Sequence, residues 1–356
     1  MLALFTHSQG SVYFNQMALK SSVPLDKEVL KNAWARVMAQ HEMLRTGFVQ
    51  LHNQKHPFAM ITYHEGLEVP WYEAKKLTKE ERGAREQQVL TNLHQPPWVI
   101  SIEPRDGLTT MHFSALHALY DAQSLESIFS DVEAAYKGLD LARPASIPAT
   151  LGPILIESQS QIQNSQDFWQ RLISEAHPSK FPDLNPTRTD EKALLSISSV
   201  CSEPLKVLED RCRELGITLQ AAGQVAWARL LAAYTGEQSV TFGTVLSGRN
   251  LSAAAQDAVF PCLVTVPSPV RIDGTNRELL GRTLKQNASL TKHQFTPLAQ
   301  IQRWLGSDEP LFDTLFVYQK FASSTGESEA WEVIDEETQI DVGTPLSSIL
   351  LYDFSC

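Results

Sequence analysis

The segment 109–125 constrains the fold of this chain more than any other. Residues 109–117 largely alternate between apolar and polar side chains, the pattern of a β-strand with one face toward a core. From residue 125 onward, apolar side chains recur at the three- and four-residue spacing of an amphipathic helix. The segment therefore predicts a strand, a turn and a helix, with His117 at the end of the strand and Asp121 in the turn.

The polar pair His117 and Asp121 admits two interpretations. A junction between a strand and a helix can be reached from solvent, so the pair is a candidate catalytic site. Asp121 can equally cap the following helix, and His117 can be structural, because this spacing also arises by chance. His112 points to the other face of the strand, where we expect it to pack or to lie at the surface.

Two patterns upstream of this segment predict further elements of the same lobe. Alternating residues on both sides of Asp106-Gly107 predict a β-hairpin, because Asp-Gly favours a tight turn. Asp26 is expected to cap a helix, since a periodic apolar stripe follows it. His41 lies on that stripe, and we interpret it as a buried core histidine.

A break in the pattern divides the chain near its middle. The segment 141–150 has two prolines and little periodicity, which predicts a linker. Strands and amphipathic helices alternate on both sides of it, and this alternation favours layered packing. We expect an α/β (α+β layered) fold with two lobes, at 1–150 and 151–356.

The second lobe is expected to contain strands at 194–200 and 239–246, with an Ala-rich buried helix at 218–234. The extended run 257–272 contains several prolines, which favour an edge or irregular strand because proline cannot donate to the ladder.

Composition excludes several classes of partner. The formal net charge is −11, and no cluster of Lys and Arg exists that could bind a phosphate backbone, so no nucleic acid is expected. No run of 18 apolar residues and no signal-peptide pattern occurs, which predicts no membrane insertion and a soluble cytoplasmic protein.

The four cysteines, Cys201, Cys212, Cys262 and Cys356, are scattered without a Cys-x-x-Cys pair or a partnering histidine. Neither a zinc site nor a disulfide framework is therefore expected.

Several motifs, in order along the chain, resemble those of the condensation domain of nonribosomal peptide synthetases, in its fungal form. Residues 40–48 are similar to the family's Arg-His-Glu-x-Leu-Arg-Thr-x-Phe, and residues 116–122 to its His-His-x-x-x-Asp-Gly. Ser124 matches the serine that often follows. The remaining matches are at 243–249, 260–271, 293–294 and 311–319.

The resemblance implies two lobes related to chloramphenicol acetyltransferase, arranged as a V with a central tunnel. It implies an amide bond formed between an acyl or peptidyl thioester donor and an aminoacyl acceptor. No cofactor would be bound directly, because both substrates arrive on the phosphopantetheine arms of carrier proteins. Adjacent adenylation domains would be further partners. The sequence of residues 118–125 is similar to that found in fungal siderophore synthetases.

The resemblance also implies roles for individual residues. His117 is the second histidine of the motif and the expected catalytic residue, either as a base or by orienting the amine. A free α-amino group is partly unprotonated near pH 7, so little basic strength is needed. Asp121 is expected to be structural and held by an arginine, for which Arg45 and Arg249 are the candidates.

The sequence departs from the family pattern at several positions. Leu116 replaces the first histidine of the motif, and Ala122 replaces a glycine whose position can require close backbone approach or a positive φ. The family's opening motif is absent, and the sequence stops following the family after about residue 339. We therefore expect a fragment whose second lobe is incomplete.

Two other functions are compatible with these residues. The missing ends and Ala122 are consistent with a condensation-domain remnant that docks carrier proteins without catalysis. A stand-alone acyltransferase that uses acyl-CoA would also carry His-x-x-x-Asp, although no Asp-Phe-Gly-Trp-like motif is present.

Overall fold

The computed structural model describes a defined part of the chain, namely residues 13–51, 58–76, 78–174, 179–182, 197, 199–249, 253–307, 309–318 and 331–334. The strand predicted at 194–200 falls mostly outside these residues, and the stretch 341–356 lies wholly outside them.

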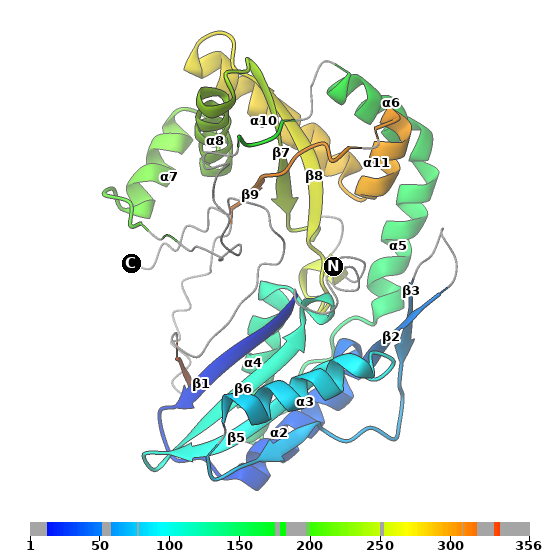
Figure 1. The fold of residues 1–356 in the computed structure, drawn as a ribbon, viewed down its shortest axis with the longest axis vertical. Coiled ribbons are helices and arrows are strands. Elements are labelled where there is room, and N and C mark those ends of the chain that lie inside the picture. The colour runs from blue at the N-terminus through cyan, green and yellow to red at the C-terminus, as the bar shows by residue number, and fades with distance from the viewer. Residues whose placement is uncertain are drawn as a thin grey trace. The chain divides into compact units, whose positions relative to one another are not determined.

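The chain forms two compact units (Figure 1). Unit 1 comprises residues 1–152, 249–262 and 324–344, and unit 2 comprises residues 153–248, 263–323 and 345–356. A linear division at residue 150 assigns 249–262 to the second lobe, whereas these residues cluster with the first. The reason is a set of side-chain contacts between residues distant in sequence, described below.

Unit 1 is built on a mixed five-stranded sheet with the strand order β10-β1-β6-β5-β4. Only the β4–β5 pair is parallel. The strands are β1 (Phe14–Ser21), β4 (Trp71–Glu73), β5 (Trp98–Arg105), β6 (Leu108–Leu116) and β10 (Trp331–Val333).

Two helices, α2 (Lys27–Gln40) and α4 (Ala122–Tyr136), contribute to the core on one face of this sheet. The Asp26 carboxylate accepts hydrogen bonds from two backbone N–H groups at the start of α2, which confirms the predicted cap. Trp34 of α2 stacks on Phe113 of β6 with ring centroids 5.5 Å apart, and both side chains are buried. The alternation in β6 therefore delivers its apolar residues to this core, as predicted.

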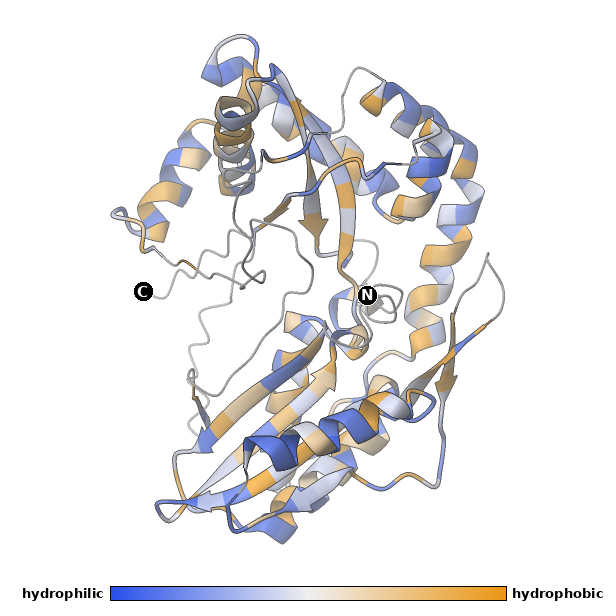
Figure 2. Cartoon of the chain, viewed as in Figure 1, coloured by the Kyte–Doolittle hydropathy of each residue, from blue (hydrophilic) through white to orange (hydrophobic). Residues whose placement is uncertain are grey.

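The opposite face of the sheet is covered by α3 (Lys79–Thr91), whose outer side is mostly hydrophilic (Figure 2). This contact is polar: Glu86 is 6% exposed and accepts hydrogen bonds from Ser114 of β6 at 2.8 Å and Gln16 of β1 at 2.5 Å. Burial raises the pKa of the Glu86 carboxyl, against the opposing effects of Ser114 and Arg82.

The predicted hairpin is present between β5 and β6. Asp106 and Gly107 have φ values of 55° and 78°, the left-handed backbone that a two-residue turn of this kind requires.

A second, two-stranded sheet of unit 1 pairs β2 (Thr46–Gln50) with β3 (Phe58–Thr62). It follows a 3₁₀ turn, η1 (Glu42–Arg45). Gly47 of β2 approaches the backbone of residue 94 so closely that an added Cβ would lie 1.9 Å from the His94 carbonyl oxygen. Only glycine fits this approach.

The linker predicted at 141–150 is wrong for its last four residues, because α5 (Ile147–Ser160) begins there. The Ser146 hydroxyl accepts a hydrogen bond from the Ala149 N–H and caps the helix. Pro148 lies in the first turn, where a backbone N–H has no partner within the helix, so proline is tolerated. Proline predicts a break in a helix interior, whereas Pro148 lies at a helix start.

Unit 2 contains a three-stranded sheet with the order β8-β7-β9. Its strands are β7 (Ser239–Leu246), β8 (Val264–Arg271) and β9 (Leu315–Val317). Pro267 and Pro269 lie in β8, and in the described part of the sheet β8 is an edge, as the prolines predict. The helices of this unit are α6 (Ile162–Ile173), α7 (Leu205–Glu214), α8 (Leu219–Thr235), α10 (Asn276–His293) and α11 (Leu298–Leu305).

One core cluster of unit 2 lies where α8 and α10 pack on this sheet, and a second one lies between α6, α11 and the same sheet. Trp227 and Leu231 of α8 are buried with Phe242 of β7, which confirms the Ala-rich helix at 218–234 as a buried element.

Replacing Gly47 with alanine should destabilise the chain by about 2 kcal/mol or more, because the fixed His94 carbonyl occupies the space of the new methyl group. Gly83→Ala is the matched control. Gly83 lies within α3 with nothing near its Cβ position, so alanine there should stabilise by roughly 0.5–1 kcal/mol. Urea unfolding of both variants measures the difference, and equal effects would contradict this account of β2.

Glu86→Gln should change how stability depends on pH. A carboxyl whose pKa is raised by folding binds protons more tightly in the folded state, so wild-type stability falls as pH rises above the usual value of 4.5. The variant loses this decrease, and its stability relative to wild type should rise between about pH 4 and pH 7. Unfolding midpoints across this range test it. Glu80→Gln, an exposed position of the same helix, should run parallel to wild type.

Candidate active site

His117 lies where β6 ends and a short 3₁₀ turn, η2 (His117–Leu119), begins. Its backbone N–H donates a hydrogen bond to the Tyr13 carbonyl at 2.7 Å, so the position of its main chain is fixed by the start of β1. The side chain is half-buried, in contrast to the buried residues that flank it on both sides. At the end of the strand, the main chain of His117 is therefore held in place while part of its imidazole remains accessible to solvent.

The hydrogen bond of the ring determines its tautomer. Nδ1 of His117 lies 2.9 Å from the backbone carbonyl oxygen of Tyr120. A carbonyl can only accept, so Nδ1 carries the proton and Nε2 of the neutral ring keeps a lone pair. Among the described residues, Nε2 has no polar partner. The ring is thus prepared to accept a proton or a hydrogen bond at Nε2.

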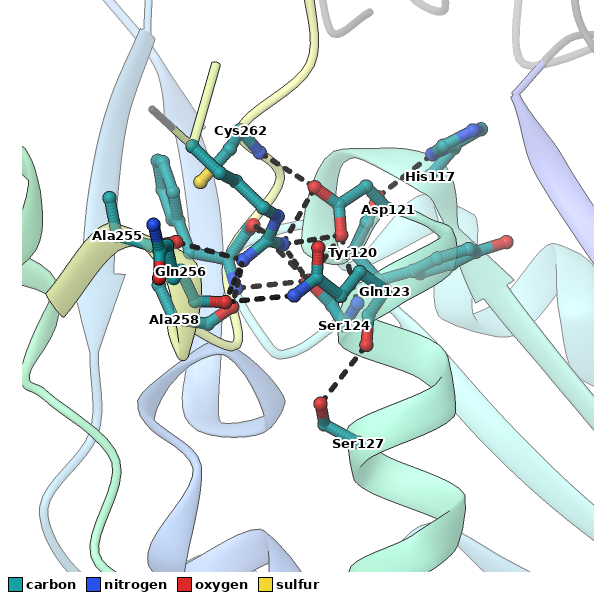
Figure 3. A network of polar contacts seen from close by, with 12 residues as sticks. His117, Tyr120, Asp121, Gln123, Ser124, Ser127, Ala255, Gln256, Ala258 and Cys262 are labelled. Atoms are coloured by element: carbon teal, nitrogen blue, oxygen red, sulfur yellow. Dashed lines mark hydrogen bonds and ion pairs between the residues drawn. The ribbon is translucent and has the colours of Figure 1, made fainter. Parts of the chain in front are cut away.

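Asp121 lies at the start of α4 and is 2% exposed. Its Oδ1 accepts hydrogen bonds from the N–H and the hydroxyl of Ser124, at 2.8 and 2.7 Å, which caps the helix. Its Oδ2 accepts from the Cys262 N–H at 3.0 Å. In Figure 3 the imidazole of His117 has a polar contact with the Tyr120 carbonyl, and no dashed line joins it to the Asp121 carboxylate. Asp121 therefore acts on the backbone of the turn and not on the ring.

Arg249 contacts Asp121 from 128 residues away in sequence. One guanidinium nitrogen, NH2, donates to both carboxylate oxygens at 2.6 and 2.8 Å, and both side chains are buried. The other terminal nitrogen donates to the carbonyls of Ala255 and Ala258, at 3.1 and 2.7 Å. The arginine thus holds residues 253–262, which include the short helix α9 (Ala253–Gln256), against the turn.

Arg45, the other arginine considered for Asp121, is placed elsewhere. Its guanidinium donates to the backbone carbonyls of Met38 and Tyr63 and so ties α2 to the end of β3. Of the two candidates, only Arg249 reaches Asp121 among the described contacts.

Ser124 and Ala122 occupy the first turn of α4. The Ser124 hydroxyl is within 3.1 Å of the Phe260 carbonyl, the Phe260 N–H and Arg249, so a single small side chain joins the helix to segment 249–262. Ala122 is exposed and takes up helical backbone as the first residue of α4. The positive φ considered for this position is therefore not required here.

The other two histidines considered above are buried and serve packing. His41 is 2% exposed, and its Nε2 lies 2.7 Å from Asp131 of α4. Burial lowers the pKa of His41, although Asp131 opposes this effect. His112 is 4% exposed under α3, with Nδ1 2.7 Å from Arg82.

Tyr120 was not singled out by sequence reasoning. One of its contacts with the ring of His117 is made by its backbone carbonyl. Every residue type has such a carbonyl, so the sequence does not reveal this contact. The one available signal is its position, an aromatic residue three places after a candidate histidine within a turn.

The described residues offer no group of three His, Cys, Asp or Glu side chains that could hold a metal ion. Within the same residues, no helix is both long and apolar enough to span a bilayer.

The fold and this turn define a class of protein. The sequence model of the Condensation domain family matches residues 3–356, and the chain therefore belongs to that family. The mixed strands and helices of the structure agree with the layered α/β fold expected from the motifs.

Several of its relatives in sequence are fungal synthetases. The chain is 43% identical to the nonribosomal peptide synthetase sidC of Arthroderma benhamiae, over 98% of its own length and 7% of that protein. It is 36% identical to nonribosomal peptide synthetase 2 of Cochliobolus heterostrophus, over 96% of this chain and 6% of that one. The hydroxamate-type ferrichrome siderophore peptide synthetase of Schizosaccharomyces pombe is 28% identical, over 89% and 6%. The chain thus spans a small fraction of each of these relatives.

Solved structures share its fold. The condensation domain of the monacolin K polyketide synthase MokA matches with a TM-score of 0.70 at 17% identity, over 91% of this chain and 81% of that one. The starter condensation domain of the rhizomide synthetase RzmA matches with a TM-score of 0.68 at 15% identity, over 96% and 82%.

Asp121→Asn should destabilise the chain by about 3 kcal/mol or more, because it leaves the Arg249 charge buried without a counterion. It also turns one accepting oxygen into a donor facing N–H groups. Denaturant unfolding measures the loss. Glu133→Gln, in the exposed pair with Lys137, is the control and should cost about 0.5 kcal/mol or less. Similar losses for both would show that the buried pair does not organise the turn.

Proposed function

We propose that this domain forms an amide bond between two substrates, each bound as a thioester to the phosphopantetheine arm of a carrier protein. One observation carries the proposal: the ring of His117 has its Nδ1 proton engaged by the Tyr120 carbonyl, while Nε2 keeps its lone pair on a half-buried ring. A neutral imidazole with one available nitrogen suits a reaction in which an amine must lose a proton.

The reaction requires few groups. The acceptor amine attacks the carbonyl carbon of the donor thioester, a C–N bond forms, and the C–S bond breaks to release a thiolate. The nitrogen loses one proton, which passes by way of Nε2 of His117 to the departing sulfur. Because a thiolate is a good leaving group and a free amine is a good nucleophile, holding the amine beside Nε2 supplies much of the acceleration.

Asp121, Arg249 and Ser124 have supporting roles in this proposal, because they contact the turn and not the imidazole. Ala122 is compatible with it, since its methyl group points to solvent from an ordinary helical position. Arg45 ties α2 to the end of β3 in this structure and is given no role at the turn.

The partners proposed for this domain are donor and acceptor carrier proteins and adjacent adenylation domains, within a larger cytoplasmic synthetase. The relatives named sidC and ferrichrome siderophore peptide synthetase support a siderophore peptide as the product class. The domain itself would bind no further cofactor.

His117→Ala should reduce amide formation between loaded carrier proteins by a factor of about 100 or more, since it removes the proton acceptor. The amide product is cleaved from the acceptor carrier and quantified by mass spectrometry. His64→Ala, an exposed histidine of the same unit, should leave turnover unchanged. Full activity of the folded His117 variant would refute the catalytic assignment of His117. Carrier binding by the wild-type chain without any amide formation would instead favour a domain that only docks carrier proteins.

A further inference from the structure

The side chain of Tyr120 packs against the ring of His117. The two rings are nearly parallel, with an interplanar angle of 9° and centroids 4.9 Å apart. In Figure 3 the imidazole lies over the phenol ring. Aromatic pairs at this distance hold a preferred relative orientation. Tyr120 therefore contacts the imidazole twice, with its ring and with its backbone carbonyl.

The phenol ring is itself held at its far end. Asn15 of β1 donates a hydrogen bond from Nδ2 to the Tyr120 hydroxyl at 2.8 Å, and both residues are buried, at 2% and 4% exposure. Burial raises the pKa of the Tyr120 phenol, which keeps the group neutral in this contact. The ring thus cannot swing away without breaking a buried hydrogen bond.

Asn15 is an unusual residue for its position. It lies opposite Ala115 in the register of β1 and β6, in a row of the sheet whose neighbouring members are the apolar pairs Met17–Phe113 and Leu19–Met111. Its Oδ1 is buried and has no hydrogen-bond partner among the described residues. A buried amide that is only half satisfied destabilises the fold, so its presence calls for a compensating role. Anchoring the Tyr120 hydroxyl is the contact it makes.

We propose that Asn15 and Tyr120 form a rigid shelf that positions His117, fixing the plane and the tautomer of its ring so that Nε2 faces the reacting amine. Tyr120 and Asn15 are positioning residues and touch no substrate in this account. The proposal rests on the proposed catalytic role of His117 and names two residues that act through it.

Every variant of Tyr120 retains the backbone carbonyl. Variants of its side chain therefore test the ring and its hydroxyl separately from the carbonyl. Tyr120→Leu removes the aromatic face and keeps apolar bulk. Tyr120→Phe keeps the ring and removes only the anchored hydroxyl. Tyr136→Phe is the matched control, because its hydroxyl also holds one hydrogen bond in unit 1, from the Asp26 N–H at 2.9 Å, and lies on another element.

The first readout does not depend on catalysis. In the chain labelled with ¹⁵N-histidine, at a pH that keeps histidine neutral, the signals of His117 are identified by their loss in His117→Ala. Wild type should show a protonated Nδ1 and an unprotonated Nε2. Tyr120→Leu should shift His117 to a mixture of tautomers, whereas Tyr120→Phe and Tyr136→Phe should keep the wild-type form.

The second readout is turnover with loaded carrier proteins. Tyr120→Leu should lower kcat about tenfold with KM for each carrier within about twofold, because the ring is misplaced while the docking surfaces are intact. Tyr120→Phe should lower kcat by about two- to threefold through loss of the anchor, and Tyr136→Phe should not change it.

A folded Tyr120→Leu variant with the wild-type tautomer and kcat within twofold of wild type would overturn the proposal. If this variant does not fold, Tyr120→Phe decides: unchanged kcat would overturn the shelf, and the expected loss would support it. If His117→Ala proves active, the catalytic role proposed for His117 fails, yet the tautomer measured in Tyr120→Leu still tests whether the shelf holds the ring.

Discussion

The buried ion pair between Asp121 and Arg249 is the interaction on which the geometry of this site depends. The two residues are 128 positions apart, and the pair joins the start of α4 to the segment 249–262. A buried pair contributes little net stability, because desolvating two charges offsets their attraction. Breaking it, however, leaves a charge with no partner. The pair therefore acts mainly by selecting one arrangement of the turn, in which a carboxylate accepts from Ser124, Cys262 and Arg249 at once.

Asp121 and Tyr120 hold His117 in different ways. Asp121 fixes the backbone by capping α4, and none of the contacts of its carboxylate is with the imidazole. Tyr120, one residue earlier, takes the Nδ1 proton on its carbonyl. In a His-Asp pair in direct contact, the carboxylate would stabilise a positively charged ring. A neutral carbonyl partner sets the tautomer without adding that charge.

Much of unit 1 could be predicted from sequence because its signals are local. The alternation in β6, the cap at Asp26 and the Asp-Gly turn each act within a few residues, and each is present in the structure. The choice between Arg45 and Arg249 could not be made this way, since the pairing depends on how distant segments meet. Tyr120 escaped prediction for another reason: a backbone carbonyl is available at every residue. The helix at 147 was missed because proline in a first turn looks like a breaker when periodicity alone is considered.

The departures from the family motif have a simple physical interpretation in this structure. Leu116, which replaces the first histidine, is fully buried in the core of unit 1 and lies outside the polar network. Ala122 adds its methyl group on the exposed side of a helix that tolerates alanine well. Both side chains are apolar, so neither can take part in the hydrogen bonds of Asp121 or of the His117 ring. The polar chemistry of the motif is thereby concentrated on one imidazole, and the stacked Tyr120 with its hydrogen-bonded partner Asn15 holds the plane of that ring.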